Sequence, residues 1–248
     1  MNKRRLFIAS CIALIATAMT FAIRGDILEA LRNQFGLNNE QVGEVAGIAF
    51  LGFTISIFIG GPLCDAVGMG RLLALAFVCH TLGVLLMIFA PGYWVLWSGS
   101  LIGGLGNGLI EAAVNPLIAT VYSDQKTEKL NALHVWFPGG IVIGGLLAYF
   151  MTKANLGWQI KWATILIPTV IYGVLFLGQR FPATERVQSG VSTGAMFKEV
   201  LRPLFLVFAF CMLLTASTEL GPNQWIPDVL NPAVGGLGIV VLVWINGL

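Results

Sequence analysis

Seven long apolar runs dominate this 248-residue chain and constrain its fold more than any other feature. An α-helix needs about 20 apolar residues to cross a bilayer, where a helix can satisfy all of its own backbone hydrogen bonds. The runs predict transmembrane helices over residues 6–24, 42–63, 72–90, 94–120, 132–152, 158–178 and 203–226. An eighth run opens at Leu237 and is too short to span.

Composition supports a membrane protein. Only 10% of the residues are charged, whereas soluble domains average about 25%, so the chain lacks the charge to cover a water-facing surface. We therefore predict an all-α, polytopic protein that has the lipid bilayer as its surroundings. The net charge of +2 is too small to indicate a nucleic-acid partner.

The basic residues are distributed unevenly between the two sides of the predicted membrane. If the amino terminus lies inside, four basic residues face outside and ten face the cytoplasm. The four outer ones are Arg24, Arg32, Lys153 and Lys161. The ten inner ones are Lys3, Arg4, Arg5, Arg71, Lys126, Lys129, Arg180, Arg186, Lys198 and Arg202. Positive residues are enriched on the cytoplasmic side of membrane proteins. This bias predicts a bacterial inner-membrane protein with a cytoplasmic amino terminus.

The longest connection follows the sixth predicted span. We expect a six-helix transmembrane bundle over residues 1–178, a cytoplasmic linker over 179–201, and the start of a second bundle over 202–248. Because the second bundle holds only one full helix and a partial one, we expect a truncated chain whose carboxy-terminal bundle is missing.

The turn after the second predicted helix contains a glycine–aspartate–glycine pattern. Gly61, Asp65, Gly68 and Arg71 are its key positions. The glycines permit a tight turn, and a carboxylate can interact with the positive start of a neighbouring helix. The segment resembles the signature between helices two and three of the major facilitator superfamily, which implies a gating loop. The other usual basic positions hold Ala66, Met69 and Gly70, and an ordinary polar turn is the alternative.

Glu111 is the only charged residue within the fourth predicted span. Since an ionised carboxylate is costly in lipid, we expect Glu111 to face a cavity, where it could carry a proton. The alternative is a structural hydrogen bond between helices. Asp26 and Glu219 lie on helices one and seven. In the resembled superfamily, helices one, four and seven open successive repeats and line the central cavity. For Asp26 alone, an interfacial charge cluster with Arg24 is the alternative.

A narrower resemblance rests on three segments. Glu111-Ala112-Ala113-Val114-Asn115-Pro116 resembles a stretch of the fucose–galactose–glucose proton symporters, Leu130 to Phe137 resembles their next polar segment, and Asp26 matches their first-helix aspartate. The resemblance implies that Asp26 and Glu111 are proton-coupling carboxylates, with protons as the coupling ion and no other cofactor. Gly25 and His134 depart from the family pattern, where asparagine and glutamine are usual.

Several polar and aromatic residues are candidates for contact with a small solute. The predicted substrate-binding set comprises Asn115, His134, Trp136, Glu219, Asn223, Gln224 and Trp225. Amides bind hydroxyls and an indole offers a flat apolar face, so the set suits a sugar ring. The alternatives are a packing role for His134 and an interfacial tryptophan belt at the end of helix seven.

Together these features predict a secondary active transporter that takes up a hexose with protons by alternating access. A facilitator-fold sensor without transport and an efflux carrier are the alternatives. We expect no enzyme activity, because the carboxylates lie on separate helices with no recognisable nucleophile or metal set.

Overall fold

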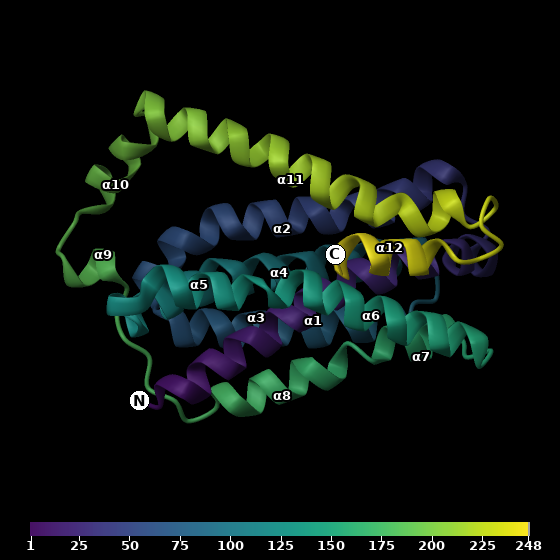
Figure 1. Ribbon diagram of the computed structural model, residues 1–248, viewed down its shortest axis with the longest axis horizontal. Coiled ribbons are helices and arrows are strands. Elements are labelled where there is room, and N and C mark those ends of the chain that lie inside the picture. The colour runs from purple at the N-terminus through teal and green to yellow at the C-terminus, as the bar shows by residue number, and fades with distance from the viewer. Residues whose placement is uncertain (248) are drawn as a thin grey trace.

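In the computed structural model, which describes residues 1–247, helices form every regular element (Figure 1). Seven helical segments are long and apolar enough to cross a membrane, as the sequence predicted. Five of them are single helices: α1 (Lys3–Phe35), α2 (Asn39–Val67), α3 (Met69–Ile88), α4 (Tyr93–Val121) and α11 (Pro203–Leu230). We call the end that carries the amino terminus the linker end and the opposite end the far end.

The fifth and sixth spans are interrupted, which the apolar pattern did not predict. The fifth consists of η1 (Ser123–Gln125), α5 (Lys126–His134) and α6 (Trp136–Lys153), and the sixth of α7 (Trp158–Ala163) and α8 (Leu166–Phe176). A proline follows each helix break by a few residues, at Pro138 and Pro168. Because proline has no N–H, neither residue can donate to the carbonyl four positions earlier, and the helix breaks there.

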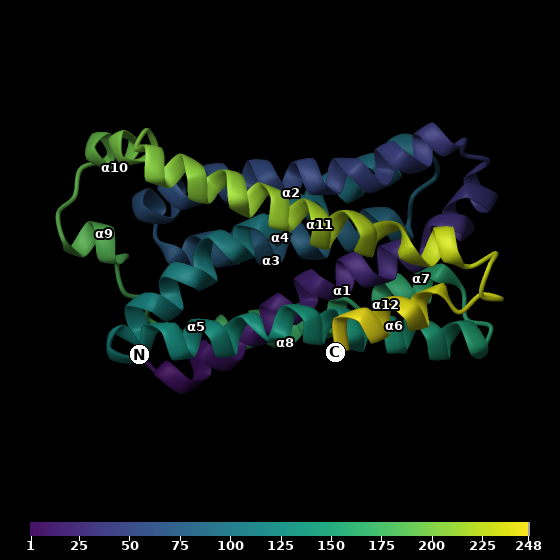
Figure 2. The ribbon, with the colours of Figure 1, turned by 45° about the horizontal axis from the view of Figure 1, so that its top comes forward.

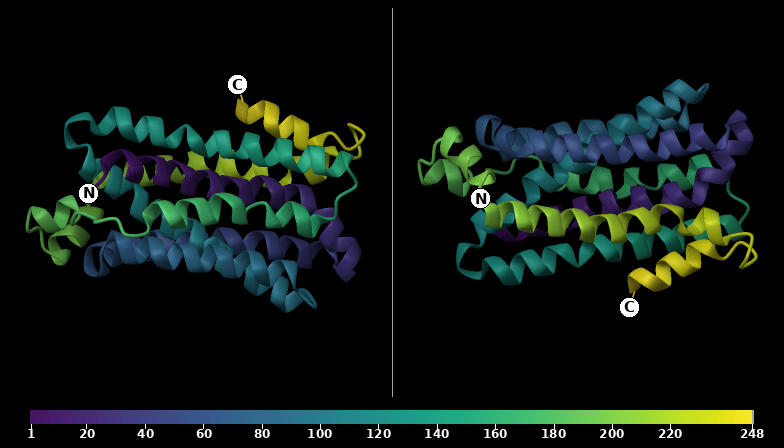
Figure 3. Two further views of the ribbon diagram at one scale, coloured as in Figure 1. Left: turned by 90° about the horizontal axis from the view of Figure 1, so that it is seen from below. Right: turned by 90° about the horizontal axis from the view of Figure 1, so that it is seen from above.

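The first helix is longer than predicted. It continues to Phe35 and ends at Gly36, whose φ of 62° is the left-handed conformation that glycine adopts readily. Arg24 and Asp26 therefore lie inside α1 and not at its end. Most of α1 is buried, since it runs between the other helices of the bundle (Figures 2 and 3).

Glycines on α4 let α2 approach its backbone closely. A Cβ at Gly104 would lie 2.1 Å from the carbonyl oxygen of Ala49, and one at Gly108 would lie 2.1 Å from Ser56 Oγ. Small residues at such contacts increase the van der Waals packing that holds helices together in lipid. The glycine-rich stretch is thus the contact surface between α2 and α4.

A buried hydrogen-bonded chain connects four helices. Asn107 Nδ2 donates to Thr20 Oγ1 (2.8 Å), so Asn107 Oδ1 accepts from His80 Nε2 (2.8 Å). His80 Nδ1 is then the acceptor for the Tyr172 hydroxyl (3.0 Å). The chain joins α1, α4, α3 and α8, and it fixes the uncharged tautomer of His80 that carries its proton on Nε2.

Asn107→Ala is expected to lower the free energy of unfolding by about 1–3 kcal/mol, because it leaves the buried His80 Nε2–H without an acceptor and removes the donor to Thr20 Oγ1. SDS-induced unfolding in mixed micelles would measure the change. The double variant His80→Leu/Asn107→Leu should recover part of the loss, since it removes the unpaired His80 N–H, although the Tyr172 hydroxyl then loses its acceptor. A double variant that loses as much as the two single variants combined would contradict this role.

The rest of the chain is arranged around α11. Before it come α9 (Glu185–Gln188) and α10 (Thr193–Val200), and after it comes α12 (Gly238–Gly247), which is too short to span. Residues 203–214 of α11 are all exposed, whereas its buried residues lie near its end, at Asn223, Gln224 and Pro227. There α11 meets α1: a Cβ at Gly25 would lie 2.9 Å from the Gln224 carbonyl oxygen, and Arg32 pairs with Asp228 (3.4 Å).

This packing makes the linker end the open end, because α11 approaches the bundle only near the far end (Figure 1). The proposed division at residues 178 and 201 stays a prediction.

Candidate functional site

A cavity of about 550 Å³ lies between the bundle and α11. Its lining comes from α2, α4, the break between α5 and α6, and α11. The lining residues are Phe53, Ile57, Glu111, Asn115, His134, Phe137, Pro138, Met212, Ala216, Glu219 and Leu220. The structure therefore brings together four of the predicted site residues: Glu111, Asn115, His134 and Glu219.

The α4 wall of the cavity carries a carboxylate–amide pair. Asn115 Nδ2 donates to Glu111 Oε2 (3.1 Å) and to the Glu111 carbonyl oxygen (3.1 Å), because residues four apart share one face of a helix. Asn115 Oδ1 is buried and has no hydrogen-bond partner among the described residues. The pair thus leaves one buried amide oxygen without a hydrogen-bond partner in the wall of the cavity.

Two further ionisable groups face the same space. His134 is the last residue of α5, and the helix break after it places the side chain at the cavity. Glu219 lies on α11, opposite the bundle, and forms no ion pair within residues 1–247. The cavity consequently holds two carboxylates and one imidazole, contributed by three helices.

An aromatic cluster closes the cavity toward the far end. The Phe21 ring, which is buried, lies 5.9 Å from the Phe53 ring and 6.0 Å from the Phe137 ring, measured between centroids. Thr20, beside Phe21, bonds Asn107, and Asn107 lies about one helical turn before Glu111 on α4. The sequence gives no indication of this cluster, since phenylalanines inside apolar runs carry no separate signal.

Asp26 lies in a different environment from Glu111. Its carboxylate pairs with Lys161 Nζ of α7 (2.7 Å), and the two side chains are only 9% and 10% exposed. Lys161 also donates to Thr152 Oγ1 of α6 (2.6 Å). Nearby on α1, Arg24 is fully buried with its guanidinium 5.5 Å from the Trp162 ring centroid. The structure thus gives Asp26 a buried counter-ion, and its role in proton coupling stays a prediction.

Asp26→Asn is expected to destabilise the protein by about 3–5 kcal/mol, because it leaves the Lys161 ammonium buried without a counter-ion. The double variant Asp26→Asn/Lys161→Met should restore much of the stability. Unfolding in SDS micelles measures both changes, and transport by the double variant then assigns the role. Gradient-driven uptake that survives means a structural pair, whereas uptake that is lost with stability intact assigns Asp26 to coupling.

The predicted gating loop joins α2 to α3 and contacts the linker. Gly68 has a φ of 90° between the two helices, a conformation that favours glycine. Asp65 accepts hydrogen bonds from Thr184 Oγ1 and from Arg186 Nε (2.5 Å), at the start of α9. Gly61 has open space around it, and Arg71 is exposed and forms no ion pair or hydrogen bond with the described residues.

Comparison with known proteins identifies the family. The profile of the Major Facilitator Superfamily matches residues 6–247. The chain belongs to this superfamily. The gentisate transporter of Corynebacterium glutamicum is 25% identical over 85% of this chain and 50% of its own length. The probable polyol transporter 6 of Arabidopsis thaliana is 25% identical over 68% of this chain and 35% of its own length. The chain spans about half the length of the gentisate transporter.

Solved structures show the same fold. A D-xylose–proton symporter superposes with a TM-score of 0.76 at 16% identity, covering 99% of this chain and 66% of the symporter. At this identity the likeness establishes the facilitator fold alone.

The other predicted substrate residues of this facilitator chain lie outside the cavity. Asn223 and Asn246 exchange hydrogen bonds (3.3 Å each) between α11 and α12. Gln224 is buried beside α1, with no partner for its amide among the described residues. Trp136 and Trp225 are both exposed. The structure separates these four residues from Glu111, and their contact with a solute stays a prediction.

Proposed function

We propose that this chain is part of a proton-coupled carrier for a small, uncharged, hydroxyl-rich solute such as a sugar or polyol. The observation that carries the proposal is the single cavity of about 550 Å³ that Glu111 and Glu219 both line, from α4 and α11. A solute in this cavity would touch the bundle and α11 at once. Its binding can therefore be coupled to their relative movement.

The chemistry of the cavity favours hydroxyl groups over anions. Two carboxylates and the free Asn115 Oδ1 are acceptors, and hydroxyls can donate to all of them. An anionic solute would be repelled by any ionised carboxylate in a space of low dielectric constant. The solutes named for the relatives differ, so the cavity is the better guide to the solute class.

Glu111 is the proposed proton carrier. In the cavity, the ionised carboxylate of Glu111 loses much of its hydration, which costs free energy. Protonation neutralises the group and removes that desolvation cost. Asn115 Nδ2 holds Oε2, so the remaining oxygen is available for the proton or for the solute. We propose that the carrier changes state readily when Glu111 is protonated and the solute is bound, or when both have left, and rarely when only one of them is bound, which couples the two fluxes.

The packing of α11 corresponds to one of the two states that alternating access requires. Contacts at Gly25 and Arg32 close the far end, and the exposed half of α11 leaves the linker end open. The distribution of basic residues supports a cytoplasmic position for the linker end. The proposed state is therefore inward-facing. We propose that the membrane is a bacterial inner membrane.

Uptake of labelled D-xylose, myo-inositol and gentisate by cells that express the whole carrier of which this chain is part would test the proposal. We expect accumulation of the sugar or polyol that a protonophore abolishes. Accumulation of gentisate alone would refute the solute class. Saturable binding without counterflow would instead identify a sensor, and depletion of solute from energised cells would identify an efflux carrier.

A further inference from the structure

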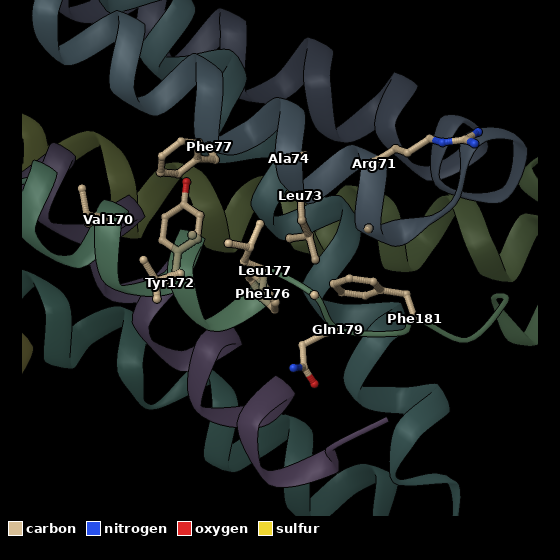
Figure 4. A pocket seen from close by; sticks show the side chains of 14 residues that line it. Arg71, Leu73, Ala74, Phe77, Val170, Tyr172, Phe176, Leu177, Gln179 and Phe181 are labelled. Atoms are coloured by element: carbon tan, nitrogen blue, oxygen red, sulfur yellow. The ribbon is translucent and has the colours of Figure 1, made fainter.

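A second cavity, of about 590 Å³, lies between α3 and α8 on the outside of the bundle (Figure 4). Its side chains are almost entirely apolar. Phe77, Tyr172 and Val170 surround one end, and Gln179 and Phe181 lie at the other, which is the linker end. We call this feature the α3–α8 groove.

The α3–α8 groove faces away from the transport cavity, toward the surroundings of the bundle. On α3 the neighbouring Val78 and Leu82 are 53% and 43% exposed, and on α8 Ile171 and Val174 are 44% and 58% exposed. In Figure 1, α11 lies on the opposite side of the bundle from α8. In a chain that spans a bilayer, such a surface is in contact with lipid.

Glycines make the groove deep. The Phe181 ring packs directly on Gly70, where a Cβ would lie 2.6 Å from the ring, and the Phe77 ring packs in the same way on Gly173. The two rings thus pack against the backbones of α3 and α8. A side chain at either glycine would push a ring into the groove. The available space is a consequence of these two positions.

Two arginines without partners stand at the linker end of the groove. Arg71 lines it, and in Figure 4 its guanidinium extends past the apolar side chains. Arg180 lies between the lining residues Gln179 and Phe181. Neither forms an ion pair or hydrogen bond with the described residues, and both are exposed. Asp65, the acidic residue of the same loop, is already paired with Arg186.

Arg5, a basic residue near the groove, differs from these two arginines because the protein itself supplies hydrogen-bond acceptors for its guanidinium. Its guanidinium donates to the carbonyl oxygens of Leu175, Val174 and Leu177, at the end of α8 (2.8, 2.9 and 3.2 Å). Arg71 and Arg180 have no such internal acceptors. The mouth of the groove therefore carries the unneutralised positive charge of Arg71 beside an apolar slot, with the exposed Arg180 next to the lining residues in the chain.

We propose that the α3–α8 groove binds one anionic phospholipid, with an acyl chain in the slot and its phosphate at Arg71 and Arg180. Each half of the ligand matches one half of the site. The acyl chain buries the exposed apolar surface of the groove. The phosphate pairs with guanidinium groups, which lie at the depth where basic side chains extend to the membrane interface. A zwitterionic lipid also carries a phosphate, but its cationic headgroup offsets that charge, so it neutralises the arginines less well than an anionic lipid does.

Native mass spectrometry of the purified chain, incubated with equimolar phosphatidylglycerol and phosphatidylcholine, tests the proposal. We expect selective retention of one phosphatidylglycerol. Arg71→Gln and Arg180→Gln should each weaken this retention about fivefold, which corresponds to about 1 kcal/mol per basic residue. Arg202→Gln is the matched control, because Arg202 is an exposed basic residue that pairs with Glu199 and lies outside the groove.

A second pair of variants tests the slot. Ala74→Trp places an indole in the groove and should abolish retention of phosphatidylglycerol, whereas Leu75→Trp, which is exposed on the same helix and outside the lining, should leave it unchanged. Size-exclusion profiles confirm that both variants are folded. Equal retention of the two lipids, or retention unaffected by both arginine variants, would overturn the proposal. Competition by glycerol phosphate alone would also overturn it, because it would show an anion site that needs no acyl chain.

Discussion

Glu111→Gln is expected to abolish uphill accumulation and reduce the ratio of internal to external solute to about 1, because a carrier without proton coupling can only equilibrate its solute. The amide keeps the shape of the side chain and its contact with Asn115. Solute binding and counterflow should therefore survive. Uptake in proteoliposomes, with an imposed pH gradient and without one, separates the two activities.

Glu128→Gln is the matched control for this prediction. Glu128 is an exposed carboxylate on α5 that pairs with its neighbour Lys129. Its replacement should leave the accumulation ratio unchanged. If the Glu111 variant accumulates solute as well as the Glu128 variant does, then Glu111 does not carry the coupled proton.

Gly104→Ala should prevent stable assembly of the bundle. The added methyl group would lie 2.1 Å from the Ala49 carbonyl oxygen and 2.8 Å from the Ala49 Cα, so the α2 backbone would have to move. Overpacking typically costs about 1–3 kcal/mol, and more where the obstacle is backbone and not a flexible side chain. We expect loss of the monodisperse peak in fluorescence-detected size-exclusion chromatography.

Gly103→Ala provides the control on the preceding residue. A Cβ at Gly103 would meet nothing within 4 Å, so the variant should elute as the parent chain does and gain slightly from the better helix propensity of alanine. Equal behaviour of the two variants would show that the close approach of α2 and α4 does not limit stability.

The length of the apolar runs was enough to predict the spans, because the thickness of a bilayer fixes how many residues a helix needs. An isolated carboxylate in such a run, Glu111, was also informative, since only a cavity or a partner makes its burial tolerable. Glu219 was predicted to line the same cavity through its place on helix seven, and His134 was predicted as a solute contact through the family position that it occupies; both line the cavity of Glu111.

Other features depend on contacts between residues distant in sequence. Lys161 lies 135 residues from Asp26, and no local pattern indicates that pair. His80 and Asn107 lie within apolar runs, where the sequence does not show which neighbouring helix each one faces. The breaks after His134 and Ala163 could have been predicted from Pro138 and Pro168, because a missing N–H has a fixed local effect. The apolar pattern alone conceals them.

The contacts of α9 determine where the chain can bend. Arg186 pairs with Asp65, and Glu185 pairs with Lys126 (2.7 Å). These two ion pairs hold α9 against the bundle. In the alternating-access scheme proposed above, α9 would travel with α1–α8, and Ser189–Ser192 would be the tether to α10 and α11. Fully extended, these residues reach about 14 Å. This linker length sets an upper limit on the distance that α10 and the start of α11 can move from the bundle while both ion pairs of α9 remain intact.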